Sequence, residues 1–223
     1  MSKVLILVTN HATLGSTDQA NGTYTPELTH ALQAFLEAGF SYDIASIKGG
    51  AAPLYGADMD DAITQKILAM DDFQSRINNT IVASQLEGQV FDAVFYPGGF
   101  GLLSDLAEHE GVARLTAKLY EAGAVLGSVC HGPAGLLPIT LSDGSSILAG
   151  KTVTAFTREE EIDFGTLPDI PFLLEESLTR KAGAYHKVAP WTEHVITDGR
   201  LITGQNPASA GAVGKAMVAA LQG

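Results

Sequence analysis

The first 47 residues place an amphipathic helix between two short apolar runs, and this pattern limits the fold more than any other feature. Residues 3–9 and 40–47 are apolar and β-prone, as buried strands are. Between them, Thr25 is a good N-cap, Pro26 takes the first helical position and Gly39 ends the helix. A strand-helix-strand unit implies a parallel sheet with a right-handed crossover. The sequence therefore predicts an α/β fold with a mainly parallel sheet.

The alternation continues towards the C-terminus, so we predict one domain over residues 1–223. The further elements expected are strands at 91–96, 125–130 and 152–156, helices at 112–121, 171–182 and 207–221, and a hairpin with strands 195–197 and 201–203 around Asp198-Gly199-Arg200.

Residues 48–89 interrupt this rhythm. The segment is acidic at 58–61 and 71–72, and its apolar positions suggest short helices. Because it carries too little apolar sequence for a core of its own, we predict an insertion on the sheet. Insertions of this kind commonly form a lid or a dimer contact.

The composition excludes several classes of partner. The formal net charge of -12 removes the electrostatic basis for binding nucleic acid or an anionic membrane. The apolar run that follows Lys3 is too short for a signal peptide or a membrane span. With one cysteine and no targeting segment, the expected location is the reducing cytoplasm.

Residues 125–133 form the most chemically informative segment. The apolar run ends at Cys130, the single cysteine, and His131, Gly132 and Pro133 then open a helix expected to continue to residue 137. Strand-to-helix turns place nucleophiles in α/β enzymes, and the N–H groups that face such a turn favour thiolate. The alternative is a small buried hydrophobe, as free cysteines often are. The flanking glycine and proline favour a reactive Cys130.

A second segment is expected at the same sheet edge. Pro97-Gly98-Gly99 follows a strand and suits an oxyanion or phosphate site, although a tight turn explains it equally well. Its spacing does not fit a dinucleotide site. Gly99 and the backbone of His131 are candidate oxyanion donors. The His131 side chain either reaches the sulfur or bonds backbone at the helix start.

Acidic residues offer candidates for proton transfer. Glu27 lies in the first turn of a helix, where the macrodipole alone explains a carboxylate, but it is also expected near Cys130 and suited to shuttle a proton. Glu27 and His30 form an E-x-x-H pair without a second such pair, so we predict no metal. Thr157 and Glu160 fit a capping box, which leaves Glu161 free to point elsewhere.

These segments resemble a known family. Glu27, Pro97-Gly98-Gly99 and residues 124–134, with Cys-His-Gly-Pro-Ala at their centre, are similar to the ThiJ/PfpI superfamily, which has the class I glutamine amidotransferase fold. This resemblance implies a flavodoxin-like three-layer α/β/α sandwich that is usually a homodimer. Within the superfamily, residues 150–157, 189–191 and 196–210 resemble the heat-inducible chaperone and glyoxalase III branch.

The resemblance also implies roles for individual residues. Cys130 corresponds to the nucleophile, Glu27 to the acid/base, His131 to its partner and Glu161 to a third, orienting carboxylate. Gly98, Gly99 and His131 correspond to substrate or oxyanion contacts. The branch often has Pro-Gly-Gly-His-Gly, whereas Phe100 replaces that histidine here. This difference concerns the substrate more than the reaction type.

The expected function is that of an enzyme without a cofactor. The resemblance implies addition of Cys130 to a 2-oxoaldehyde such as methylglyoxal and conversion to a 2-hydroxy acid without glutathione. One alternative is a chaperone or redox-stress module that binds unfolded clients. Another is an amidase or peptidase, because a thiolate beside oxyanion donors also suits acyl transfer. An amidotransferase subunit is disfavoured, because that family's downstream His-x-Glu arrangement is not visible.

Overall fold

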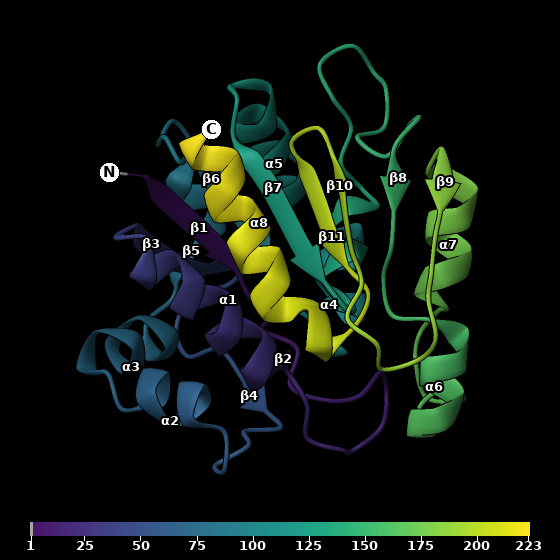
Figure 1. Cartoon of the computed structure of the whole chain (residues 1–223), viewed down its shortest axis with the longest axis horizontal. Helices are drawn as coiled ribbons and strands as arrows, with labels where there is room; N and C mark the ends of the chain where they lie inside the picture. The colour runs from purple at the N-terminus through teal and green to yellow at the C-terminus, as the bar shows by residue number, and fades with distance from the viewer. Residues whose placement is uncertain (1) are drawn as a thin grey trace.

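A seven-stranded sheet forms the centre of the computed structural model, which describes residues 2–223 (Figure 1). Neighbouring strands are parallel, except that β10 runs antiparallel to β11. The predicted mainly parallel α/β fold is confirmed. In spatial order the strands are β10 (Val195–Asp198), β11 (Leu201–Gly204), β7 (Val125–Val129), β6 (Ala93–Tyr96), β1 (Lys3–Leu7), β3 (Ser41–Ser46) and β5 (Ile81–Val82).

Helices cover both faces of the sheet and give three layers (Figure 1). One face carries α1 (Thr25–Glu37), α2 (Ala62–Leu68), α3 (Asp71–Asn78) and α8 (Ala210–Gln222). The other carries α4 (Gly101–Ser104), α5 (Glu110–Glu121) and the 3₁₀ helices η1 (Ala83–Leu86), η2 (Leu106–Glu108) and η3 (Gly132–Leu136).

The remaining elements lie around this sandwich. Beyond the β10 edge of the sheet lie α6 (Arg158–Phe164), α7 (Leu174–Lys181) and a two-stranded pair, β8 (Thr152–Val153) and β9 (Ala184–Tyr185) (Figure 1). A second short pair consists of β2 (Thr23–Tyr24) and β4 (Leu54–Tyr55), and η4 (Pro207–Ser209) precedes α8.

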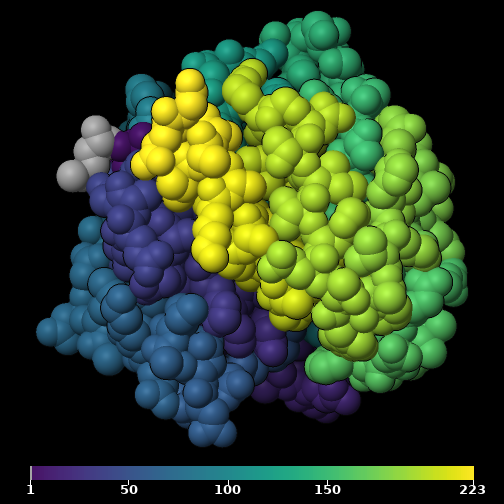
Figure 2. Space-filling view, in the orientation of Figure 1, coloured from purple at the N-terminus to yellow at the C-terminus, as the bar shows by residue number. Residues whose placement is uncertain are grey.

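Side chains of the central strands alternate between two cores. In β1, Val4 and Ile6 pack in the cluster under α1 and α8, whereas Leu5 and Leu7 pack in the cluster under α5. Because both faces are covered, the strand reads as a continuous apolar run. Figure 2 shows α8 lying against the N-terminal part of the chain. Gly214 permits this close packing, since a Cβ there would lie 2.9 Å from the Ala31 backbone.

The order of the strands determines where a ligand site forms. The chain passes from β1 to β3 and β5 on one side, then crosses to β6 and β7 on the other side of β1. The connections after β1 and β6 therefore leave in opposite directions. In open α/β sheets, ligands bind at the carboxyl ends of the strands near such a switch point.

Two local predictions are confirmed and two are wrong. The structure contains the capping box of Thr157 and Glu160 and the hairpin of β10 and β11. Thr25, however, is not an N-cap: Tyr24 precedes α1 without a side-chain cap, and the Thr25 hydroxyl donates to the Tyr55 carbonyl at 2.8 Å. After the cysteine, the expected helix is only the 3₁₀ turn η3. Pro138 lacks the N–H that a continuing helix needs at this point.

Residues 48–89 pack onto the sheet rather than forming a core of their own. Ile67 in α2 and Phe73 and Ile77 in α3 join the cluster under α1, and β5 completes one edge of the sheet. The same segment brings Tyr55 towards the carboxyl ends of the strands. Among residues 2–223, no helix combines the length and apolar character needed to cross a membrane.

Candidate active site

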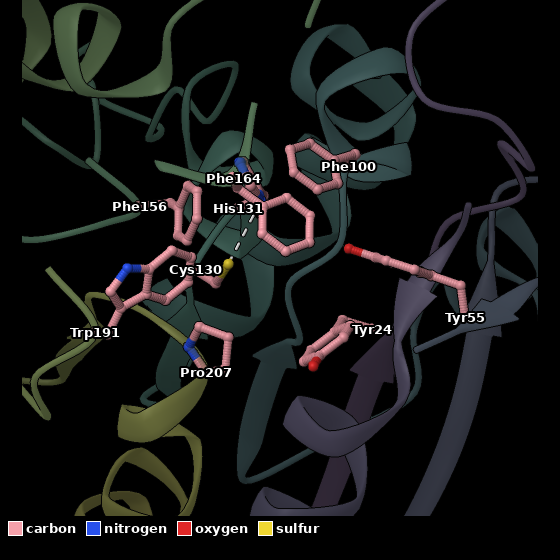
Figure 3. A pocket seen from close by; sticks show the side chains of 9 residues that line it. All are labelled: Tyr24, Tyr55, Phe100, Cys130, His131, Phe156, Phe164, Trp191 and Pro207. Carbon is pink, nitrogen blue, oxygen red and sulfur yellow. Dashed lines mark hydrogen bonds between the residues drawn. The ribbon is translucent and has the colours of Figure 1, made fainter. Parts of the chain in front are cut away.

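Cys130 occupies a strained turn at the end of β7. Its φ of 60° lies in the left-handed region, which costs a non-glycine residue about 1–3 kcal/mol. Two backbone hydrogen bonds hold the turn: the Cys130 N–H donates to Gly204 at 2.9 Å, and the Phe156 N–H donates to the Cys130 carbonyl at 3.0 Å. Gly132 is required because a Cβ there would lie 2.3 Å from the Tyr96 carbonyl oxygen. The turn directs the sulfur into a cavity (Figure 3).

His131 connects the sulfur to a buried carboxylate. Its Nδ1 lies 3.4 Å from the Cys130 Sγ, and its Nε2 lies 2.8 Å from the Glu161 Oε1. The His131 and Glu161 side chains are each only 1% exposed. Because the carboxylate accepts the Nε2 hydrogen, Nδ1 is left as an acceptor facing the thiol. The Thr166 hydroxyl donates to the other Glu161 oxygen and fixes its orientation.

Glu27 contacts the same place from α1. A Cβ on Gly98 would lie 2.1 Å from the Glu27 Oε2 and 2.7 Å from the Cys130 Cβ, so both side chains press against this glycine. Burial raises the Glu27 pKa to about 8, and the Cys130 thiol and Gly98 N–H partly offset the rise. Neither group reaches full hydrogen-bond geometry with the carboxyl oxygens. Glu27 is thus a buried acid whose oxygens remain unpaired within the described chain.

The Cys130 thiol has a raised pKa, contrary to the thiolate expected from the sequence. Burial contributes most, followed by the charge of Glu27. The physical reason is that η3 is too short to provide a strong helix dipole, while Cys130 is buried, with only 5% of the residue exposed. Both members of the Cys130–Glu27 pair therefore favour their protonated forms, and they titrate as a coupled pair.

The candidate oxyanion donors lie beside this pair. Gly98 contacts both reactive side chains, and its carbonyl accepts the Tyr24 N–H at 3.0 Å. Gly99 has a φ of 123° and packs against the backbone of residues 22–24, where a Cβ would clash. Within residues 2–223, no hydrogen bond occupies the N–H of Gly99 or of His131. Their role as oxyanion donors stays a prediction.

A small aromatic cavity of about 60 Å³ lies over the sulfur (Figure 3). Phe100, which replaces the family histidine, is 3% exposed and packs on the His131 ring with centroids 4.3 Å apart. A hydrocarbon face thus replaces a polar group beside the imidazole. The lining residues are Tyr24, Tyr55, Phe100, Cys130, His131, Phe156, Phe164, Trp191 and Pro207.

Glu160 holds in place the segment that carries Trp191, one of the residues that line the cavity. One carboxyl oxygen completes the capping box with Thr157, as the sequence predicts. The other oxygen accepts three hydrogen bonds. They come from the Trp191 backbone N–H at 2.9 Å and from the side-chain amides of Asn206 at 2.8 Å and Gln205 at 3.2 Å. Trp191, with a φ of 63°, is the second non-glycine residue in the left-handed region among those described. Both strained residues line the same cavity.

The structure brings together the candidate residues Cys130, Glu27, His131 and Glu161, but sequence reasoning did not predict the aromatic residues around them. Tyr55, Phe164 and Trp191 come from three distant segments, and no local pattern marks them as neighbours. Residues 189–191 and 196–210 carry the family resemblance in the sequence, which predicts no role for any of them. The E-x-x-H pair is not assembled as a ligand pair, because His30 contacts Asp61 at 2.6 Å while Glu27 is buried at the site. Among residues 2–223, no cluster of three His, Cys, Asp or Glu side chains could hold a metal ion.

The Glu161 carboxylate is expected to control the reactivity of the thiol. Glu161→Gln keeps the shape of the side chain but removes the negative charge that faces His131 and would balance the positive charge gained when His131 takes the thiol proton. Cys130 alkylation by iodoacetamide at neutral pH should therefore slow by roughly tenfold. Glu159→Gln, on the exposed side of the same helix, is the matched control. An unchanged alkylation rate in Glu161→Gln would show that the carboxylate does not act on the thiol through His131.

Comparisons with known proteins identify relatives of this chain. The glutathione-independent glyoxalase HSP31 of Saccharomyces cerevisiae is 30% identical, with 93% of each chain covered. The structure of Rapid Encystment Protein 24 kDa from Francisella tularensis superposes with a TM-score of 0.94 at 30% identity and 99% coverage of both chains. Glyoxalase III from Candida albicans gives a TM-score of 0.86 at 26% identity, covering 98% of this chain and 97% of its own. The DJ-1/PfpI family model matches residues 19–220, so this chain belongs to the DJ-1/PfpI family.

Proposed function

We propose that this chain is a glutathione-independent glyoxalase that converts 2-oxoaldehydes such as methylglyoxal to 2-hydroxy acids. The main support is the contact of a buried acid, Glu27, and a thiol, Cys130, with the same glycine beside a small cavity. The thiol can bind the aldehyde covalently while the acid moves a proton between the two adjacent carbons. Relatives that carry this name in yeasts support the same reaction.

The reaction begins when the Cys130 sulfur adds to the aldehyde carbon. The thiol proton passes to the His131 Nδ1, 3.4 Å away, and then to the former aldehyde oxygen, giving a hemithioacetal. Glu161 stabilises the positive charge that His131 carries between these transfers. In this mechanism the backbone N–H groups of Gly99 and His131, which have no protein acceptor within residues 2–223, stabilise the transient negative oxygen.

Glu27 carries the proton transfer between carbons. Its carboxylate removes the proton from the hemithioacetal carbon, giving an enediolate with the negative charge on the second oxygen, and returns that proton to the neighbouring carbon. The hydroxyl proton moves to the second oxygen, and the product is a thioester of a 2-hydroxy acid. Water then hydrolyses the thioester and restores the Cys130 thiol. A pKa of about 8 makes Glu27 able both to accept and to return a proton near neutral pH.

The cavity limits the size and polarity of the substrate. Its volume of about 60 Å³ is far below the roughly 300–1,000 Å³ typical of sites for drug-sized ligands. A glutathione adduct would not fit such a space, whereas a short 2-oxoaldehyde would. Phe100, Phe156 and Phe164 favour an apolar substituent on the carbonyl carbon. Because Cys130 supplies the thiol, the reaction needs neither glutathione nor another cofactor.

The test is formation of the hydroxy acid by purified protein. Methylglyoxal incubated with the protein, without glutathione or metal, should yield lactate in proportion to the enzyme concentration. A stereospecific lactate assay separates this from slow spontaneous chemistry, which gives both enantiomers. Absence of enzyme-dependent lactate across several 2-oxoaldehydes would rule the proposal out.

Other partners and the location stay predictions. A homodimer follows from the family resemblance, and sedimentation analysis would test it. A reducing cytoplasm would suit a catalytic thiol and provide the 2-oxoaldehyde. Binding of unfolded clients is a second candidate function. Three apolar residues of one region are exposed, with exposed fractions of 56% for Ile162, 58% for Phe164 and 43% for Trp191.

A further inference from the structure

Tyr55 faces the reactive cysteine from the opposite wall of the cavity. Figure 3 shows its ring entering from the β4 side, with the hydroxyl directed towards Cys130. Within residues 2–223, the Phe100 backbone N–H approaches the oxygen of this hydroxyl, and the hydroxyl donates to no protein acceptor. The residue comes from segment 48–89, far in sequence from the other reactive groups. Its position therefore gives that segment a part in the site.

The backbone and ring of Tyr55 are held firmly in place. β4 pairs with β2, which places Tyr55 opposite Tyr24, and the Thr25 hydroxyl donates to the Tyr55 carbonyl at 2.8 Å. The ring packs against Tyr24 and Phe100, with centroid distances of 5.2 and 6.4 Å. Since α1 begins at Thr25, this anchoring also fixes Tyr55 relative to Glu27.

The phenol of Tyr55 acts as a donor rather than as a base. Burial raises its pKa well above the usual value, and the nearby Cys130 and Glu27 raise it further. The Phe100 backbone N–H approaches the phenolic oxygen and partly offsets this rise. The hydroxyl therefore keeps its hydrogen across the range of pH in which the enzyme would operate, and that hydrogen is free to bond a ligand.

A 2-oxoaldehyde has two oxygens on adjacent carbons. The backbone N–H groups at the Cys130 turn can donate hydrogen bonds to only one of them. Gly98 contacts the Cys130 side chain, and the N–H groups of its neighbour Gly99 and of His131 have no protein acceptor within residues 2–223, so we assign them to the aldehyde oxygen that forms when the sulfur attacks. The second oxygen, on the neighbouring carbon, projects away from the sulfur into the cavity. Negative charge develops on this second oxygen when Glu27 removes the proton from the first carbon.

We propose that the Tyr55 hydroxyl donates a hydrogen bond to the second carbonyl oxygen of the bound 2-oxoaldehyde and stabilises the enediolate. Tyr55 is thus a further catalytic residue of the glyoxalase reaction proposed above. This role rests on that proposed function. No atom is transferred permanently: the hydrogen bond strengthens as charge builds and weakens when the second carbon is protonated. The contact also selects dicarbonyl substrates over simple aldehydes, which lack the second oxygen.

Tyr55→Phe tests this role, because it removes the hydroxyl and keeps the ring packed against Tyr24 and Phe100. The variant should lose roughly 10- to 100-fold in kcat with KM changed less than about threefold, since the bond strengthens in the transition state. The rate of Cys130 alkylation should be unchanged. Tyr120→Phe is the control: its ring stacks on Arg200, 4.3 Å away, outside the cavity.

A second measurement does not depend on turnover. Methylglyoxal protects Cys130 from iodoacetamide by forming the hemithioacetal, and the half-protecting concentration measures this adduct. Tyr55→Phe should need roughly three- to tenfold more methylglyoxal, as expected for loss of one hydrogen bond to a neutral oxygen. Protection by acetaldehyde, which has one oxygen, should be the same in both proteins.

The outcomes separate this inference from the proposed function. Wild-type turnover with an unchanged kcat in Tyr55→Phe would overturn the role of Tyr55 and leave the glyoxalase proposal standing. Weaker protection by methylglyoxal alone, in a protein without turnover, would support the contact while refuting the reaction. A parallel loss in alkylation rate would overturn the inference, because the hydroxyl would then act on the thiol rather than on the substrate.

Discussion

Cys130→Ser is expected to reduce 2-hydroxy acid formation by at least roughly 1,000-fold, because a buried serine hydroxyl is a far weaker nucleophile than the thiol. The substitution keeps the size of the side chain and the strained elbow. Lactate production from methylglyoxal measures the loss. The unfolding temperature should stay close to that of the wild type.

The single cysteine provides an independent control for this experiment. Alkylation of the wild-type protein with iodoacetamide modifies only Cys130 and should remove the same activity. Substantial lactate formation by Cys130→Ser would exclude the covalent mechanism. If both proteins lack turnover yet suppress aggregation of an unfolded client equally, client binding at the exposed apolar side chains would replace catalysis as the function.

Glu27→Gln is expected to lower kcat by roughly 100- to 10,000-fold, the range typical of a general base. The amide cannot take hydrogen from the hemithioacetal carbon, whereas Cys130 should still form the adduct. In the wild type, kcat/KM should rise with pH up to an inflection near pH 8, where the free Glu27 carboxyl ionises. A flat pH profile, or a variant with normal kcat, would contradict the assigned role.

The same substitution should change how protein stability depends on pH. The folded-state pKa of Glu27, about 8, lies above its unfolded value of 4.5. Between these values the folded chain keeps the proton that the unfolded chain releases, so stability falls as pH rises through this window. This loss amounts to about 3 kcal/mol by pH 7.

Chemical denaturation at several pH values measures this difference. The free energy of unfolding of Glu27→Gln should decline less between pH 5 and pH 8 than that of the wild type. Glu37→Gln makes the same change at an exposed position of α1 and should follow the wild-type curve. Parallel curves for all three proteins would show that Glu27 is already ionised in the folded state. Activity and stability thus oppose one another at Glu27, as in many active sites.

Local patterns in the sequence predict six of the seven strands of the sheet and the long covering helices α1, α5 and α8, but not the edge strand β5. Apolar strand runs, the proline at the start of α1 and the Thr157 capping box depend on residues within one turn or one strand, so they can be read without a fold. Cys130 and Glu27 were candidates because each lies where a strand or a helix meets the carboxyl edge of a parallel sheet. Their spatial relation follows from that topology.

Only the tertiary structure decided the ionisation of these groups and the shape of the cavity. The expected thiolate depended on a helix dipole, but burial beside Glu27 raises the Cys130 pKa instead, and burial is a sum over many distant segments. The pairing of β4 with β2 positions Tyr55 at the cavity, and the hydrogen bond to Glu160 positions Trp191 there. Sequence patterns report short-range preferences, whereas desolvation and the walls of a cavity arise from chain segments that meet only after folding.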